Sequence, residues 1–444
     1  MKREGQQFIV REIPEKLVRV VLIFAGLLIW NISAFPQKVP SPVYNIYRGS
    51  THAHTSYTRS HGEQFIKNPG GGIAVFDDQP GDTIGAWKDG YKKGRGCPAI
   101  IIIGSSQYPG PAMLIKPDWQ KFQGPPSAHF ALARANNFDF YITTDHSQEY
   151  VFNPPAISNN AWSDTKHAAE EATDKDFVGL RGYEHSENNG PNGQGHINII
   201  NSATYLNALD PGVDLPYLYN WLKRAKSNGE GPVVAVFNHP APEQYNNWGY
   251  RDPEITGIIT MLEMINSNDK IHYEAFINSL EKGWKVAPVC GNDNHGLTGI
   301  TKHTSRTFVL ATNKTKSAIL DAMKNRRMYA SLEQNIQCTY TVNDSIMGSD
   351  LPASNVYKFR ININDPDTEN PGDRITKIEI IGDSGRVVKS FSTDSSHSVK
   401  WNPTIRNASD KYFFIRIYNK SGGDAASADP GKPIAWLAPV WTGK

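Results

Sequence analysis

Apolar and polar positions alternate with two different periods over the first three quarters of the chain. Apolar runs of strand length recur at 43–50, 138–144, 177–183, 197–200, 233–237, 258–265, 286–289 and 307–311. Segments with apolar residues at helical spacing stand between several of these runs, at 127–136, 162–173, 215–227, 272–282 and 316–324. Strands that alternate with helices predict an α/β architecture.

The pattern changes after residue 331. Strand-like runs occur at 337–342, 356–363, 375–381, 387–391, 398–401, 412–418 and 434–440. They are separated by Asn, Asp, Gly and Ser turns and show no helical period. This predicts an all-β sandwich of immunoglobulin-like architecture over 332–444. The sequence shows no cluster of metal ligands there, so we interpret this region as a structural or docking module.

The N-terminus has a basic, polar lead followed by the apolar run 20–30 and a small residue, Ala34. Eleven apolar residues are short for a bilayer span and are typical of a secretory signal. We therefore predict a signal peptide over 1–34 and a periplasmic or extracellular protein. An uncleaved membrane anchor is the alternative.

The α/β region is then expected over 35–331, with a Gly- and Pro-rich insertion over 63–126. This insertion is either a lid over a site or a passive surface excursion. A chain of 444 residues with 39% hydrophobic residues supports two folded domains. The formal net charge of +2 gives no reason to expect a nucleic-acid partner. Three widely spaced cysteines predict neither a disulfide framework nor a thiolate metal site.

Side chains that can bind metal stand at the ends of successive predicted strands. Residues i and i+2 of an extended strand point to the same side, so the two imidazoles of a His-x-His pair can reach one ion. The residues at these strand ends are His52 and His54, Asp145 and His146, Glu184, His196, His239, and Asp293 and His295; His61 follows the first pair closely. The sequence therefore predicts one shared metal site.

The ordered motifs His-x-His, Thr-Asp-His, Gly-Tyr-Glu, Asn-His-Pro and Asp-x-His resemble the PHP superfamily (polymerase and histidinol phosphatase domains) over about residues 44–331. The closest resemblance is to the branch of carbaryl-hydrolase-like metallohydrolases. It implies a distorted seven-stranded β/α barrel with two or three metal ions at its C-terminal face. The ligands carried over by position are His52, His54, His61, His146, Glu184, His196, His239, Asp293 and His295.

The ligand types constrain the chemistry. Imidazoles and carboxylates without thiolates suit Zn, Mn or Fe. Glu184 can bridge two cations, and metal-activated hydroxide is then available for hydrolysis. Asp145 either relays a proton or orients His146, and the second role is the plainer one. His303 and Arg306 follow the last motif and are candidates for binding an anionic substrate, although a solvated loop explains them equally well.

Three functions fit these observations. The first is an exported hydrolase that cleaves a small-molecule ester, foremost a phosphoester, with two or three divalent ions. The second is a carbamate, carboxylic ester or amide hydrolase that uses the same cluster. The third is a non-catalytic exported protein that binds metal or carbohydrate. No stable membrane partner is expected unless the N-terminal segment is an anchor.

Overall fold

The computed structural model describes residues 42–58, 65–67, 72–76, 99–103, 113–115, 123–187, 194–267, 270–422 and 432–443. The predicted signal segment, His61 and most of the insertion over 63–126 lie outside these residues. No helix in the described part of the chain is long and apolar enough to cross a membrane.

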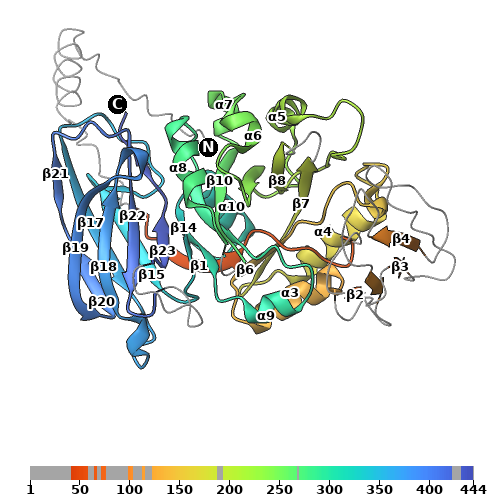
Figure 1. Ribbon diagram of the computed structural model, residues 1–444, viewed down its shortest axis with the longest axis horizontal. Coiled ribbons are helices and arrows are strands. Elements are labelled where there is room, and N and C mark those ends of the chain that lie inside the picture. The colour runs from red at the N-terminus through yellow and green to blue at the C-terminus, as the bar shows by residue number, and fades with distance from the viewer. Residues whose placement is uncertain are drawn as a thin grey trace, which may run out of the picture. The chain divides into compact units, whose positions relative to one another are not determined.

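The regular elements follow the predicted order (Figure 1). The helices are α3 (Pro126–Ala135), α4 (Asn160–Ala172), α5 (Leu215–Arg224), α6 (Gln244–Trp248), α7 (Pro253–Thr256), α8 (Tyr273–Glu281), α9 (Thr298–Lys302) and α10 (Lys316–Lys324). The strands up to residue 331 are β1 (Asn45–Ser50), β2 (Phe65–Lys67), β3 (Gly72–Phe76), β4 (Ala99–Ile103), β5 (Met113–Ile115), β6 (Phe140–Thr143), β7 (Val178–Glu187), β8 (Gly195–Ile200), β9 (Val234–Asn238), β10 (Ile259–Asn266), β11 (Lys270–Ile271), β12 (Ala287–Gly291), β13 (Arg306–Ala311) and β14 (Met328–Ser331). The later strands are β15 (Gln337–Val342), β16 (Ser345–Ile346), β17 (Val356–Asn364), β18 (Ile375–Ile381), β19 (Val387–Ser396), β20 (Ser398–Trp401), β21 (Thr404–Arg406), β22 (Tyr412–Asn419), β23 (Ala435–Leu437) and β24 (Val440–Trp441); short 3₁₀ turns stand at Tyr150–Phe152, Pro371–Asp373 (η2) and Asp383–Gly385. The mixed α/β class predicted from the sequence is confirmed.

Parallel pairing brings the carboxyl ends of several strands to one side. β1 pairs in parallel with β6, β6 with β7, β9 with β10, and β10 with β12. β8 runs antiparallel to both β7 and β9, because it follows β7 without a crossover helix. The segment after β12 lies beside the segment after β1, where Ala53 and Asn294 form an isolated β-bridge. The segments that follow β1, β6 and β12 are thereby brought together with β7 and β8.

The five predicted helices form as α3, α4, α5, α8 and α10, whereas the short helices α6, α7 and α9 were not predicted. Asp214 caps α5 by accepting a hydrogen bond from the backbone N–H of Tyr217. The apolar residues Leu215, Leu218 and Leu222 recur at helical spacing, and all three are buried. This single buried face holds α5 against the strands. α4 and α10 begin in the same way, at Asn159 and Thr315.

The C-terminal strands form two layers that pack on each other. One sheet contains β15, β16, β17, β20 and β21; the other contains β18, β19, β22 and β23. The ring of Phe413 lies 5.3 Å from that of Tyr357 and 5.7 Å from that of Phe359, centroid to centroid. Alternate residues of β17 are buried, as expected for a strand with one covered face. The immunoglobulin-like topology stays a prediction.

Backbone pairing crosses the predicted boundary after Ser331. β14 pairs with β23, with Tyr329 opposite Leu437 and Ser331 opposite Ala435. Met328 and Tyr329 share one hydrophobic cluster with Tyr340 from the other side of that boundary. The division at 331 therefore stays a prediction, and the described residues from Tyr44 onward form one compact unit.

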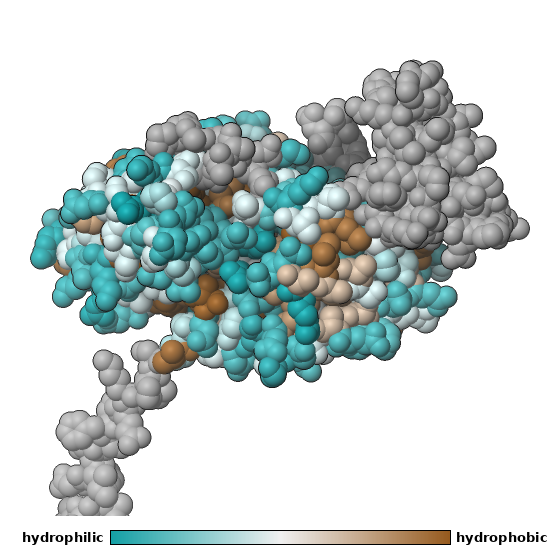
Figure 2. All heavy atoms as spheres, turned by 90° about the horizontal axis from the view of Figure 1, so that it is seen from below, coloured by the Kyte–Doolittle hydropathy of each residue, from teal (hydrophilic) through white to brown (hydrophobic). Residues whose placement is uncertain are grey.

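One face of the molecule is drawn in Figure 2 by hydropathy. Hydrophilic colours dominate its described atoms, and smaller hydrophobic patches interrupt them. Among the described residues, exposed large hydrophobic side chains are scattered along the chain, for example Val43, Ile157 and Tyr250. Single exposed apolar residues of this kind are ordinary and mark no binding surface.

Candidate metal centre

His52 and His54 lie directly after β1 and are fully buried. Each ring is held through its Nδ1 atom: His52 Nδ1 lies 2.7 Å from Glu263 Oε1, and His54 Nδ1 lies 3.2 Å from Thr58 Oγ1. If each Nδ1 donates to its partner, each Nε2 carries a free lone pair. The two Nε2 atoms are only 3.0 Å apart. Two acceptor nitrogens that converge in this way are arranged as ligands of a cation.

Glu184 in β7 is the carboxylate at the middle of the cluster, and it is 1% exposed. Its two oxygens face different histidines. Oε1 lies 3.1 Å from His196 Nδ1 and 3.4 Å from His239 Nε2, whereas Oε2 lies 2.9 Å from His146 Nε2. A carboxylate placed in this way can bridge two ions.

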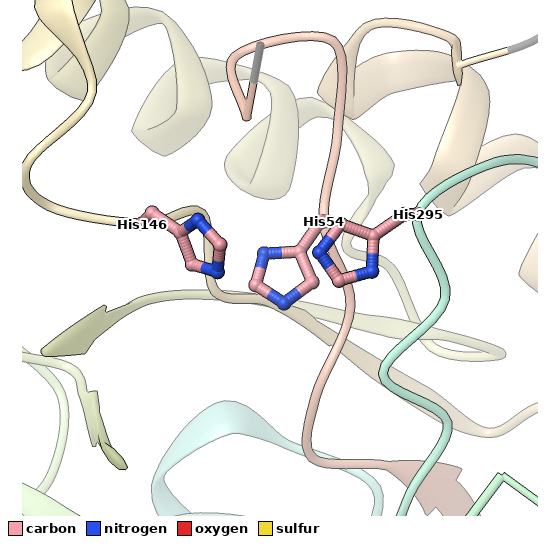
Figure 3. Close-up of side chains that lie close together, drawn as sticks. All are labelled: His54, His146 and His295. Atoms are coloured by element: carbon pink, nitrogen blue, oxygen red, sulfur yellow. The ribbon is translucent and has the colours of Figure 1, made fainter. Parts of the chain in front are cut away.

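Figure 3 shows three of these rings, which come from three separate segments. His54 follows β1, His146 follows β6, and His295 follows β12. The rings of His54 and His295 are stacked with centroids 4.1 Å apart, and that of His146 lies 4.5 Å from His54 in an edge-on arrangement. The alignment of strand ends therefore brings together histidines that are up to 241 positions apart in sequence.

His239 and Asp293 reach the cluster from left-handed backbone. Their φ angles are +27° and +48°. Side chains other than glycine rarely adopt such angles, and each costs of the order of 1–3 kcal/mol. Hydrogen bonds hold both residues in place: His239 N–H donates to Glu263 Oε2 at 2.7 Å, and Asp293 N–H donates to His52 O at 3.1 Å.

Eight of the nine predicted ligands are brought together, and the ninth, His61, lies outside the described residues. They form overlapping groups in which one ligand atom from each residue lies within 4.8 Å of the others. Two nitrogens that share one tetrahedral zinc ion lie about 3.4 Å apart, and the Nε2 atoms of His52 and His54, at 3.0 Å, come close to that separation. The groups are His54, His146 and His295; His52, His239 and Asp293; His52, His54 and Glu184; and Glu184, His196 and His239. Because neighbouring groups share ligands, the donor set fits more than one ion.

The charges in the cluster favour a cation. Burial alone would raise the pKa of Glu184, yet neighbouring His196 and His52 hold it well below its usual value. The pKa of Asp293 is likewise well below its usual value, because His52 and His54 outweigh the effect of burial. Burial lowers the pKa of His54 to about 3, so its imidazole is neutral and able to act as a ligand. Burial alone would lower the pKa of His52, yet the neighbouring carboxylates raise it well above its usual value. The carboxylates of the centre therefore favour positive charge at this place, which a divalent ion supplies.

Three polar residues of the centre were not predicted. Glu263 lies within the mostly apolar strand β10 and is fully buried between His52 and His239. Asn238 donates to Glu184 Oε1 at 2.8 Å, and Asn266 donates to Asp293 Oδ2 at 3.1 Å. The sequence signal that could have identified Glu263 is its position as a single carboxylate in an apolar run. Burying a carboxylate costs free energy unless polar partners surround it, so such a residue indicates a buried polar site.

Asp145 has a different environment from the ligands. Its Oδ1 accepts from the backbone N–H groups of Thr55 and Thr58 and from Thr58 Oγ1, and its Oδ2 accepts from Thr55 Oγ1, all at 2.7–3.1 Å. Burial raises the pKa of Asp145 to about 6 despite these hydrogen bonds. Both oxygens are engaged with the segment that carries His54, which is the geometry of a positioning residue.

Arg306 and His303 were predicted as substrate-binding residues. Arg306 is 3% exposed, and its Nη1 atom donates to the carbonyls of His303 and Ser305 at 2.6 and 2.8 Å. Its guanidinium also stacks on Phe138, 3.8 Å from the ring centroid. These contacts give Arg306 a place in the core and no support for a role in substrate binding. His303 is half-buried at the end of α9.

Comparison with solved structures found a similar two-domain protein from Bacteroides vulgatus ATCC 8482, described as containing a predicted PHP-like metal-dependent phosphoesterase. The two chains are 14% identical over 90% of this chain and 97% of that one, with a TM-score of 0.42. No protein-family model and no curated protein matches the chain. The case for a function therefore rests on the side chains of the metal centre.

Proposed function

We propose that this protein is a metal-dependent hydrolase that cleaves ester bonds of small molecules, foremost phosphoesters. The observation that carries the proposal is the position of Glu184, whose two oxygens face different groups of histidines in a buried centre. Bound divalent ions supply Lewis-acid polarisation and lower the pKa of water, and a pair of them suits ester displacement. His52, His54, His146, Glu184, His196, His239, Asp293 and His295 would hold them.

The side chains of the centre divide by exposure. His52, His54 and Glu184 are buried, whereas the side chains of His196 and His239 are 23% and 27% exposed. A substrate therefore approaches from the side of His196 and His239. Glu263 and Thr58, which contact the Nδ1 atoms of the buried pair, keep the two Nε2 atoms directed at the cluster.

The proposal extends to the surroundings of the site. The resemblance of the motifs supports a PHP-like barrel over about 44–331, with an immunoglobulin-like sandwich behind it. The apolar run at 20–30 supports export by a cleaved signal peptide. N-terminal sequencing of the mature protein should find a start near Phe35, and an intact N-terminus on a membrane-bound protein would favour the anchor instead.

A substrate screen tests the activity. Protein purified without chelator is assayed on aryl phosphomonoesters, aryl phosphodiesters, carboxylic esters and carbamates, with the Glu184→Gln variant as the matched control. We expect phosphoester turnover that falls at least about 100-fold in the variant, because a ligand shared by two ions is lost. Turnover of carbamates or carboxylic esters alone would instead support the alternative function, a carbamate, carboxylic ester or amide hydrolase that uses the same metal cluster. No turnover of any class by protein with its metals bound would overturn the proposal.

A further inference from the structure

A second group of metal-binding side chains lies in the C-terminal region, apart from the histidine centre. Glu333 stands in the turn after β14, Asp365 directly follows β17, and Asp373 lies in η2. Each offers a carboxylate oxygen, and these atoms lie within 4.8 Å of one another. No sequence motif predicts a ligand cluster after residue 331, because the three carboxylates belong to different turns.

A second observation is that Asp365 has a buried carboxylate oxygen without a hydrogen-bond partner in the described part of the chain. The residue is 1% exposed, and its Oδ1 accepts the backbone N–H of Asp367 at 2.9 Å. Its Oδ2 is buried and has no hydrogen-bond partner within the described chain. Asn335 Oδ1, on the same turn as Glu333, is also buried without such a partner. Leaving a charged oxygen buried and unpaired costs several kcal/mol, so native proteins normally provide a partner.

Among the described residues, no ion pair joins Asp365 to a Lys or Arg side chain. The charged groups that act most strongly on Asp365 are Asp373, His397 and Asp367. Both ring nitrogens of His397 are buried and lack a hydrogen-bond partner among the described residues. Burial, together with repulsion from Asp365, raises the pKa of Glu333 to about 8. Bringing these carboxylates together is therefore unfavourable without a counter-charge.

We propose that Glu333, Asp365 and Asp373 bind one calcium ion. Calcium takes six to eight oxygen ligands at about 2.3–2.6 Å, so oxygens that share one ion lie up to about 5 Å apart. The three carboxylate oxygens, all within 4.8 Å of one another, fall inside that range. The three carboxylates supply oxygen ligands only, which is the donor type that calcium prefers. This chemistry separates the site from the histidine centre, which suits transition metals and zinc.

The ion would join two segments that are distant in sequence. The turn 332–336 leaves β14, which lies between β13 and β23 in its sheet, whereas the segment 365–373 connects β17 to β18. A ligand that binds only the folded protein shifts the folding equilibrium toward it. The calcium ion therefore stabilises the junction between the two parts of the chain.

Calcium binding by the full-length protein tests the proposal. Chelator-treated protein is dialysed against radioactive calcium, and its thermal unfolding is followed with and without calcium chloride. We expect wild type to bind calcium and to unfold at a higher temperature in its presence. Asp365→Asn should lose one equivalent of calcium and the whole shift, whereas Asp394→Asn, at an exposed position of β19, should keep both. Glu184→Gln, in the histidine centre, should also keep this equivalent.

Comparing the unfolding temperatures of wild type and Asp365→Asn, with and without calcium, distinguishes calcium binding from a purely structural role of Asp365. In chelator, Asp365→Asn should unfold at the same temperature as wild type or higher, because one repelling charge is gone. In calcium, wild type should become the more stable protein. An Asp365→Asn variant that is less stable by the same margin in both conditions would overturn the proposal. A wild-type midpoint that calcium does not move would do so too, since a bound proton would then neutralise the cluster.

Discussion

Glu263 Oε1 lies 2.7 Å from His52 Nδ1, and both side chains are fully buried. The other oxygen of Glu263 accepts the backbone N–H of His239 at 2.7 Å. One carboxylate thus fixes the ring of one ligand and the strained backbone of another. Glu263 lies 211 positions from His52 in sequence, and no metal motif includes it.

Replacing Glu263 by Gln tests this positioning role. A carboxamide has one oxygen, so it can accept from His52 or from His239 N–H but not from both in the same way. We expect metal affinity to fall roughly 10- to 100-fold while the fold is kept, as is usual for groups that orient ligands. Metal titration of chelated protein measures the affinity, and circular dichroism checks the fold. Unchanged affinity would assign Glu263 to the core alone.

Gly291→Ala tests the same contact by steric means. A Cβ atom at Gly291 would overlap Glu263 Oε1 and would lie 2.8 Å from His52 Cβ. We expect the variant to lose bound metal and stability, because neither neighbour has room to move. Gly212→Ala is the control: its Cβ would meet nothing within 4 Å, although its φ of +81° strains the backbone. Metal content after dialysis should fall only at position 291; an equal loss at both positions would point to general destabilisation.

Asp145→Asn distinguishes positioning from proton transfer. Asp145 accepts four hydrogen bonds from Thr55 and Thr58, and an amide can replace only part of them. We expect a loss of about 1–3 kcal/mol in the free energy of unfolding, since buried donors are left unpaired. Denaturant unfolding measures it. The pH profile of turnover should keep its shape; the disappearance of one ionisation would instead identify Asp145 as the proton relay.

The strand ends account for most of what sequence could predict. His-x-His on a strand and single ligands after later strands are visible because strand and helix periods locate each strand's end. The role of Glu263 in the metal centre was not predicted, because Glu263 lies inside an apolar run and the hydrophobic period there indicates only that the strand is buried. The antiparallel pairing of β8 was not predicted either, because a short apolar run does not indicate whether a strand pairs in parallel or antiparallel. The pairing of β14 with β23, and the meeting of Glu333 with Asp365 and Asp373, depend on long-range packing that no local pattern encodes.

Deleting residues 336–444 removes none of the ligands predicted for the histidine centre, yet we expect the remaining chain to be insoluble. The deletion leaves β14 without β23 and uncovers Tyr329, whose hydroxyl donates to Ile336 O at 2.7 Å. An unpaired strand edge beside exposed apolar surface favours aggregation. Soluble yield and size-exclusion chromatography measure the outcome. A monomeric, folded product with full metal content would show that the two parts are independent.

The central claim is that the buried histidines and Glu184 hold a cluster of metal ions. Elemental analysis of full-length protein purified without chelator tests it most directly, with Glu184→Gln measured alongside. We predict two or three equivalents of zinc, manganese or iron in wild type and fewer in the variant, because Glu184 belongs to two of the ligand groups. Less than one equivalent in wild type, with no uptake when these metals are added back, would contradict the account.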